Sequence, residues 1–142
     1  MEKIFDWKYA SVDYDHDWLI FFINWKRDIE LEEYQRVMIE MLEYGKIHTI
    51  ESFIADIRKQ SAVSPENQKW FINKILPSLV NECGIKRAVA IHDGSSAQKA
   101  YLSNIARQGS NRFGFKLKLT QSEKHGLAWL KRKQNRPNFF PF

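Results

Sequence analysis

Two patterns of apolar residues near the start of the chain predict a β-hairpin. Aromatic residues alternate with polar or charged ones at Phe5, Trp7 and Tyr9, and the extended character continues toward the polar segment 15–17. Alternation is typical of a strand with one exposed face, whereas the unbroken apolar run 18–23 is typical of a strand buried on both faces. The polar segment between them makes a hairpin the simplest connection. We therefore expect an edge strand paired with a central one.

After this hairpin, predicted helices and strands alternate along the chain. Short β-prone runs predict buried strands over 53–57 and 87–91, and a second alternating segment predicts a half-exposed edge strand over 113–119. Apolar residues at three- and four-residue steps predict helices. Their expected starts are Glu30, Ser64, either Ser95 or Ser96, and either Thr120 or Ser122.

Glycine and proline are expected to shape the ends of the first two helices. Gly45 and Gly84 follow the last apolar positions of these helices, and glycine commonly ends a helix. Pro77 lies inside the second helix, where it cannot donate a backbone hydrogen bond. We therefore expect a kink or a loosened last turn in that helix.

The resulting order, β-β-α-β-α-β-α-β-α, predicts an α/β protein. Strands that alternate with helices form a parallel sheet with right-handed crossovers, so we expect a mixed, mostly parallel sheet of about five strands with an N-terminal antiparallel hairpin and about four helices. A chain of 142 residues with 44% apolar content suits one domain. We expect this domain to span 1–131, with a basic tail that contains proline and phenylalanine at 132–142.

Charge is distributed unevenly. Residues 103–142 hold 9 lysines and arginines and one acid, Glu123, whereas the rest of the chain has a net negative charge. A basic third can meet nucleic acid, anionic lipid or an acidic protein, but a solvated face with a flexible tail is the favoured explanation. The basic residues form no stripe interleaved with exposed aromatics, so nucleic acid is not favoured.

The chain shows no sign of export or of a metal centre. Its single cysteine, Cys83, excludes an internal disulfide and a multi-cysteine metal site. Residues 1–20 lack the pattern of a secretory signal, and the longest apolar run is too short to span a bilayer. The four histidines are scattered without ligand spacing, and no glycine pattern for nucleotide phosphates occurs. We expect a cytoplasmic protein without metal or cofactor.

The stretch 53–70 carries the first candidate site. A strand ending in a carboxylate before a helix start is where α/β proteins often bind ligands. Asp56 and Arg58 point to the same face of the strand, where they can hold an anionic ligand or brace the turn as a local ion pair. Ser61 and Ser64 follow, and the Ser64 hydroxyl is expected to cap the next helix by accepting the Asn67 N–H.

The second candidate is the segment His92-Asp93-Gly94-Ser95-Ser96. In a parallel sheet it lies beside the loop after Asp56, so a histidine and two serines come close to an aspartate. A hydrolase needs a nucleophile at a sharp turn, and the Gly-x-Ser-x-Gly elbow is missing. A glycine turn followed by a serine cap explains the same residues. We therefore expect no catalytic residues and no enzyme.

An ordered set of short motifs runs through residues 18–131. It consists of Trp25, Glu32-Glu33-Tyr34, Asp56-Ile57-Arg58, Ser64-Pro65-Glu66-Asn67-Gln68-Lys69-Trp70, Leu76-Pro77, Gly84-Ile85-Lys86-Arg87-Ala88 and Ala128-Trp129-Leu130. Together these motifs resemble the STAS-like (anti-sigma-factor-antagonist-like, SpoIIAA-like) domains found as small stand-alone bacterial proteins. The resemblance implies an α/β sandwich with helices largely on one side of a mixed sheet, and a non-enzymatic regulatory or binding role.

The resemblance also implies a locus for phosphorylation. In STAS domains that act as phospho-switches, a serine or threonine lies where the central strand gives way to the next helix, which makes Ser64 the nearest candidate and Ser61 the second. The usual Asp-Ser-Ser-Gly or Asp-Ser-Thr-Gly pattern is replaced here by Ala62-Val63-Ser64-Pro65-Glu66. Helix capping alone explains this sequence, so a structural role for Ser64 is the favoured interpretation.

Two functions remain open from the sequence. The leading hypothesis is a regulatory module that binds another protein through the edge formed by Asp56, Arg58, Ser61 and Ser64, with the 92–96 loop beside it. The alternative is a carrier or sensor for a small anionic or lipid-like ligand between sheet and helices, favoured by the aromatic-rich interior and the basic last third. Either a monomer or a homodimer is compatible with the sequence, although Lys116 and Lys118 discourage edge-to-edge pairing.

Overall fold

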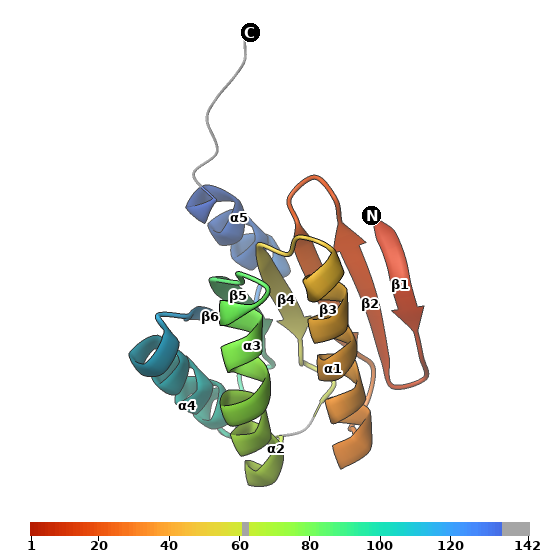
Figure 1. Cartoon of the computed structure of the whole chain (residues 1–142). Coiled ribbons are helices and arrows are strands. Elements are labelled where there is room, and N and C mark those ends of the chain that lie inside the picture. Colours follow the sequence, from red (N-terminus) through yellow and green to blue (C-terminus); the bar gives the residue numbers. More distant parts are fainter. Residues whose placement is uncertain (61–62, 135–142) are drawn as a thin grey trace, which may run out of the picture.

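Six strands form one sheet whose spatial order follows their order in the sequence (Figure 1). The computed structural model describes residues 1–60 and 63–134. The first three strands form an antiparallel meander, and β3 to β6 are parallel. Their bounds are β1 (Glu2–Asp6), β2 (Ala10–Asp15), β3 (Ile20–Trp25), β4 (Ser52–Asp56), β5 (Arg87–Ile91) and β6 (Lys116–Thr120).

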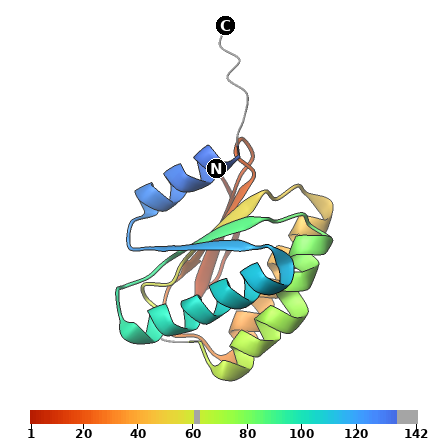
Figure 2. The same cartoon turned by 90° about the vertical axis from the view of Figure 1, so that its left-hand side faces the viewer.

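The helices lie on the two faces of the sheet in unequal numbers. Each parallel connection steps to the next strand in the same direction, and right-handed crossovers therefore put α1 to α4 on one face. The last helix, α5, follows β6 and covers the opposite face (Figure 2). The bounds are α1 (Leu31–Ile47), α2 (Pro65–Trp70), the π-helical turn η1 (Phe71–Ile75), α3 (Leu76–Asn81), α4 (Ser96–Phe113) and α5 (Glu123–Lys133).

Each face of the sheet has its own apolar core. The larger core lies under α1 to α4 and includes the fully buried side chains of Phe21, Trp25 and Met41. The smaller one lies under α5 and consists of Ile20, Ile54, Val89, Ile91 and Leu130. Successive side chains of a central strand point into the two cores in turn. Because both cores are apolar, these strands are unbroken apolar runs in the sequence. The expected α/β class, mixed sheet and N-terminal hairpin are confirmed.

The N-terminus contains one strand more than expected. A turn closed by a 2.9 Å hydrogen bond from the Trp7 N–H to the Ala10 carbonyl splits the predicted edge strand into β1 and β2. The aromatic alternation reflects this turn, because the rings of Phe5, Trp7 and Tyr9 contact one another in sequence, with centroids 4.7 and 5.5 Å apart. The expected hairpin between the alternating segment and the apolar run is present as β2 and β3.

Two predicted boundaries were wrong. Gly45 does not end the first helix but lies inside α1. A Cβ atom at this position would lie 2.9 Å from the Cys83 sulfur, so glycine here allows α1 to approach the end of α3 closely. Phe113 belongs to α4 and not to the following strand, because Gly114, in the left-handed conformation, ends α4 and β6 begins only at Lys116.

Pro77 loosens its helix, but not in the last turn as expected. The helix widens into the π-helical turn η1 before the proline, which cannot donate to that turn, whereas its end is the α-helical α3. The predicted caps are confirmed. Ser95 caps α4 and Ser122 caps α5, each accepting a backbone N–H three residues later. Within the described ranges, none of the helices has the length and apolar character needed to cross a membrane.

Candidate functional site

The sequence-predicted residues gather where β4 and β5 end. Asp56 is paired with Ile91 across the parallel ladder, and the Ile57 N–H donates to the Ile91 carbonyl at 2.9 Å. The loop after β4 and the loop after β5 therefore leave the sheet side by side, as the sequence predicted. We call residues 56–60, 63–64 and 92–96 the strand-end surface.

Asp56 and Arg58 form a two-pronged ion pair on this surface. The Arg58 Nε and Nη2 atoms donate to the two carboxylate oxygens at 3.0 and 2.7 Å, and the Arg58 backbone N–H adds a third bond at 3.1 Å. Burial tends to raise the pKa of the Asp56 carboxyl, but the hydrogen bonds and positive charge of Arg58 outweigh it, and the pKa is lowered from 3.8. The pair braces the turn and leaves half of the Arg58 side chain exposed.

Asp56→Asn should make the free energy of unfolding depend less steeply on pH in the acidic range. A carboxyl whose pKa is lower in the folded than in the unfolded protein stabilises the fold fully above the unfolded value, and this contribution is lost as the pH falls through the folded value. The free energy of unfolding of the wild type should therefore fall more steeply below about pH 4 than that of Asp56→Asn. Urea denaturation from pH 6 to pH 2.5 measures this. Parallel curves for the two proteins would contradict it.

Ser64 acts as the N-cap of α2. Its hydroxyl accepts the Asn67 N–H at 3.1 Å, Pro65 occupies the first turn, and Glu66 lies at the positive end of the helix. The Ser64 side chain is exposed, and the second phosphorylation candidate, Ser61, lies outside the described residues. The predicted cap is therefore confirmed, and phosphorylation stays a prediction.

Ser64→Ala should lower the free energy of unfolding by about 1 kcal/mol, the usual value of a lost serine cap. Ser64→Asp is the matched control, because aspartate also caps helices and favours the positive end of the helix. It should keep nearly the full stability. Thermal and urea denaturation of the three proteins test this, and equal losses for both variants would contradict the capping role.

The 92–96 loop uses its polar groups to hold its own backbone. The His92 Nδ1 atom accepts the Gly94 N–H at 3.0 Å, and the Asp93 carboxylate accepts the Ser95 N–H at 2.8 Å. The Ser95 hydroxyl in turn accepts the Gln98 N–H at 3.2 Å. Ser96 begins α4 and is exposed. Within residues 1–60 and 63–134, no serine hydroxyl forms a hydrogen bond with the His92 ring, so the loop has the geometry of a cap and not of a catalytic triad.

A buried glutamine that sequence analysis missed holds the two loops together. The Gln98 Nε2 atom donates to the Ile57 carbonyl at 2.8 Å and also to the Gln60 carbonyl, while its Oε1 atom accepts the Asp93 N–H at 2.9 Å. The Tyr101 hydroxyl donates to the Gln60 side-chain oxygen at 2.8 Å. Gln98 is 2% exposed. One signal was present in the sequence: Gln98 falls on the apolar stripe that continues with Tyr101, Leu102 and Ile105.

The sheet separates the predicted residues into two groups. Asp56 shares a face with Ile54, which belongs to the core under α5, whereas Ile57 belongs to the core on the other face. The Asp56–Arg58 pair therefore faces the α5 side, and the Ser64 cap lies with α2 on the opposite side. Sequence reasoning placed Ser64 and this pair on one edge but did not assign them to opposite faces.

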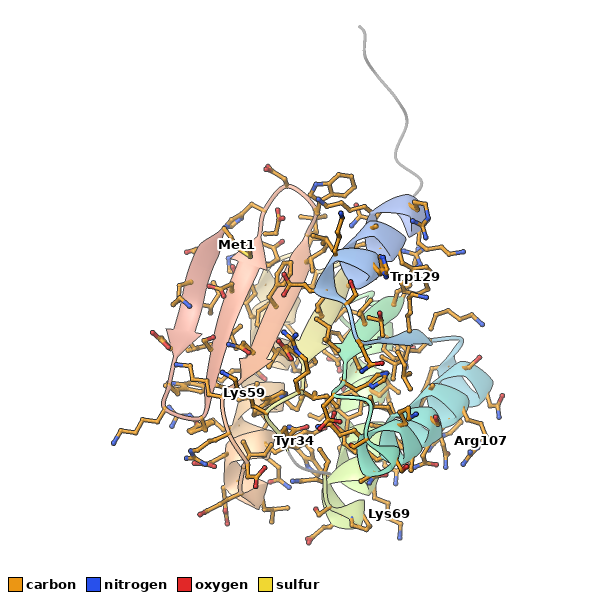
Figure 3. The ribbon with its side chains drawn as sticks, turned by 180° about the vertical axis from the view of Figure 1, so that it is seen from behind. Met1, Tyr34, Lys59, Lys69, Arg107 and Trp129 are labelled. Atoms are coloured by element: carbon orange, nitrogen blue, oxygen red, sulfur yellow. The ribbon has the colours of Figure 1, made fainter. Side chains whose placement is uncertain are left out.

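The Asp56 side opens into a polar groove. The groove has a volume of about 350 Å³, and its walls include Lys3, Asp13, Asn24 and Glu123 as well as Asp56. Figure 3 views the sheet from this side and shows α5 lying over part of it, with the N-terminal strands uncovered beside the helix. A partner that contacts Arg58 would thus find a concave, charged surface next to it.

Comparisons with known proteins agree on the fold. No protein-family model and no curated protein matches the sequence. An uncharacterised DUF3478-family protein from Shewanella loihica PV-4, described as having a SpoIIAA-like fold, matches in structure with a TM-score of 0.55 at 18% identity, covering 85% of this chain and 91% of that chain. An anti-sigma factor antagonist from Mycobacterium paratuberculosis matches with a TM-score of 0.56 at 13% identity, covering 86% and 92%. The chain therefore has a SpoIIAA-like, STAS-like fold, as the sequence motifs implied.

Proposed function

We propose that this protein is a non-catalytic, cytoplasmic regulatory module that binds another protein through the strand-end surface. The observation that carries the proposal is the rigid connection of two loops from neighbouring strands by Gln98. A surface whose backbone is already fixed loses little conformational entropy on binding. Its exposed charged side chains are those of Arg58, Lys59 and Asp93, which are suited to a polar protein partner.

The polar groups of the surface support binding rather than catalysis. His92, Asp93 and Ser95 each form a hydrogen bond with the loop backbone, so none of them is positioned to activate a nucleophile. One structural neighbour is named an anti-sigma factor antagonist, a name that describes action on another protein. We extend only this kind of role, protein binding in regulation, to the present chain.

Site-specific crosslinking tests the proposal. A photoreactive amino acid replaces the exposed Lys59, next to Arg58, in one variant and Ile47 in a control, because Ile47 is 81% exposed at the end of α1, away from the strand ends. We expect the Lys59 position, and not the Ile47 position, to give one defined protein adduct in extract of the source cells. Excess unlabelled wild type should compete for this adduct, and Arg58→Glu should not. Adducts of equal yield at both positions, or none at Lys59, would exclude this surface.

A second candidate, binding of a small ligand, rests on the interior. An apolar cavity of about 50 Å³ lies between the sheet and the helices, and the Gln60 Nε2 atom at its wall has no hydrogen-bond partner within the described residues. This volume suits a few water molecules, at roughly 10–15 Å³ each, and a lipid chain would fit only if the helices moved apart. Native mass spectrometry of gently purified protein tests this candidate. A co-purifying small molecule would support ligand binding, whereas the mass of the protein alone would count against it and leave the protein-partner proposal standing.

A further inference from the structure

The edge strand β6 lies at the bottom of a groove with two helical walls. β6 is the last strand of the sheet and pairs with β5 alone among the described strands. In Figure 2 it crosses the front of the molecule between α4 and α5, which pack on its two faces. The groove has a volume of about 580 Å³, and it is lined by both helices and by β6 itself.

Among the described residues, the backbone of β6 has groups on its outer side that no neighbouring strand pairs with. The Lys116 N–H donates to the Lys86 carbonyl and the Thr120 carbonyl accepts the His92 N–H, each at 3.0 Å, so both residues direct their backbone groups toward β5. In a parallel ladder this direction alternates from residue to residue. Leu117 and Leu119 therefore direct their N–H and C=O groups outward, where an added strand would pair with them.

The side chains of β6 alternate between charged and apolar. Lys116 and Lys118 lie on the α5 face, and the Lys118 ammonium is 5.9 Å from the centre of the Trp129 ring. Leu117 and Leu119 pack on the other face against the larger core and are only half-buried. A strand placed beside β6 thus meets lysines on one face and leucines on the other.

The charge of the groove has one sign. Lys116, Lys118 and Lys133 line it without an ion-pair partner in the described part of the chain. A fourth basic residue, Arg87, is held 3.2 Å from the Glu51 carboxylate, and no acidic residue among those described lines the groove. Three uncompensated positive charges around an open strand edge favour an acidic segment.

We propose that β6 binds an extended acidic peptide segment of a partner protein, which adds to the sheet as a further strand. The segment alternates Asp or Glu with apolar residues, so that its acids face Lys116 and Lys118 while its apolar side chains cover Leu117 and Leu119. A second copy of β6 is a poor occupant because it would place lysine beside lysine. This surface is separate from the strand-end surface and goes beyond the proposed function.

Synthetic peptides test the proposal directly. A fluorescent peptide of about eight residues, the length of a long strand, alternates Glu and Val, and its control has the same composition with the acids in one block. We expect the alternating peptide to bind at least about tenfold more tightly, with an affinity that falls as salt increases. Equal affinities for the two peptides would overturn strand addition.

Backbone methylation of the peptide separates strand pairing from charge attraction. N-methyl groups on the Val amides block antiparallel pairing with Leu117 and Leu119, and N-methyl groups on the Glu amides block parallel pairing. One of these peptides should no longer bind and the other should still bind. Loss of binding by the Val-methylated peptide indicates an antiparallel added strand, and loss by the Glu-methylated peptide indicates a parallel one. If both bind, or both fail, the proposal is wrong. Hydrogen exchange of the Leu117 and Leu119 amides should slow on binding, while that of Lys118 should not change.

Charge-reversal variants locate the peptide on the protein. Lys118→Glu should weaken binding at least about tenfold, whereas Lys8→Glu, which makes the same charge change at the opposite edge of the sheet, should alter it less than about twofold. Equal effects of the two variants would mean that net charge alone attracts the peptide. Two other results would also overturn the proposal. One is self-association of the protein that Lys118→Glu changes, and the other is a single-stranded oligonucleotide that binds more tightly than the peptide without slowing hydrogen exchange of the Leu117 and Leu119 amides.

Discussion

Gln98→Leu is expected to lower the free energy of unfolding by about 3 kcal/mol, because each buried polar group left without a partner costs about 1–3 kcal/mol. The change removes a hydrogen bond from three backbone groups. The Ile57 carbonyl keeps the Gln60 N–H at 3.0 Å, so the groups left without a partner within the described residues are the Gln60 carbonyl and the Asp93 N–H. Leucine has a similar volume and leaves no cavity that would explain the loss. The loss in free energy of unfolding therefore measures the cost of buried backbone groups without hydrogen-bond partners.

The matched control for this substitution is Gln108→Leu on the same helix. Gln108 is half-buried, and the same chemical change there should alter stability by less than about 0.5 kcal/mol. Urea denaturation of both variants gives the comparison. Hydrogen exchange should in addition become faster at residues 56–60 and 92–95 in Gln98→Leu, because the bond between the two loops is lost. A loss no greater than that of Gln108→Leu would show that Gln98 does not hold the strand-end surface.

Gly126→Ala is expected to lower the free energy of unfolding by about 2 kcal/mol through overpacking. On helix propensity alone the change should add about 1 kcal/mol, since alanine is the better helix former. However, a Cβ atom at Gly126 would lie 2.6 Å from the Val89 Cγ1 atom, and Val89 is fully buried in the core under α5. The steric conflict outweighs propensity because neither the central strand nor α5 can move without opening this core.

A double-mutant cycle isolates this contact. Val89→Ala removes the atom that the new Cβ would meet, so Gly126→Ala should cost far less in the Val89→Ala background than in the wild type. Ala128→Gly, an exposed change on the same helix, should cost about 1 kcal/mol and so gives the propensity scale for α5. Urea denaturation followed by tryptophan fluorescence, to which Trp129 on α5 contributes, measures all four variants. Additive effects of the two changes would show that Gly126 does not set the distance between α5 and the sheet.

Predictions from short-range chemistry were accurate. The caps Ser64, Ser95 and Ser122 each bind an N–H three residues later, so the necessary partners are neighbours in the sequence. The loosening before Pro77 has the same origin, because a proline always lacks its N–H. The Asp56–Arg58 brace also spans only two residues. In each case the local sequence contains both the donor and the acceptor.

Predictions that depended on distant partners failed or could not be made. Gly45 looked like a helix end because its role depends on Cys83, which only the packing of α1 beside α3 brings near. Gln98 pairs with backbone groups 38 and 41 residues away, and a glutamine on an apolar stripe does not reveal which carbonyls it will meet. The turn that splits the N-terminal strand was hidden because stacked aromatics in a turn alternate just as they do in a strand.

The sequence by itself therefore determined the α/β class, the alternation of strands and helices after the N-terminal hairpin, the serine caps and the meeting of the two loops at the ends of β4 and β5. These features follow from periodicity and from hydrogen bonds within a few residues. Only the tertiary structure decided that the Asp56–Arg58 pair and the Ser64 cap face opposite sides of the sheet, that Gln98 connects the two loops, and that β6 is an open edge between two helices. Such features depend on how elements distant in the sequence pack together, which no local pattern specifies.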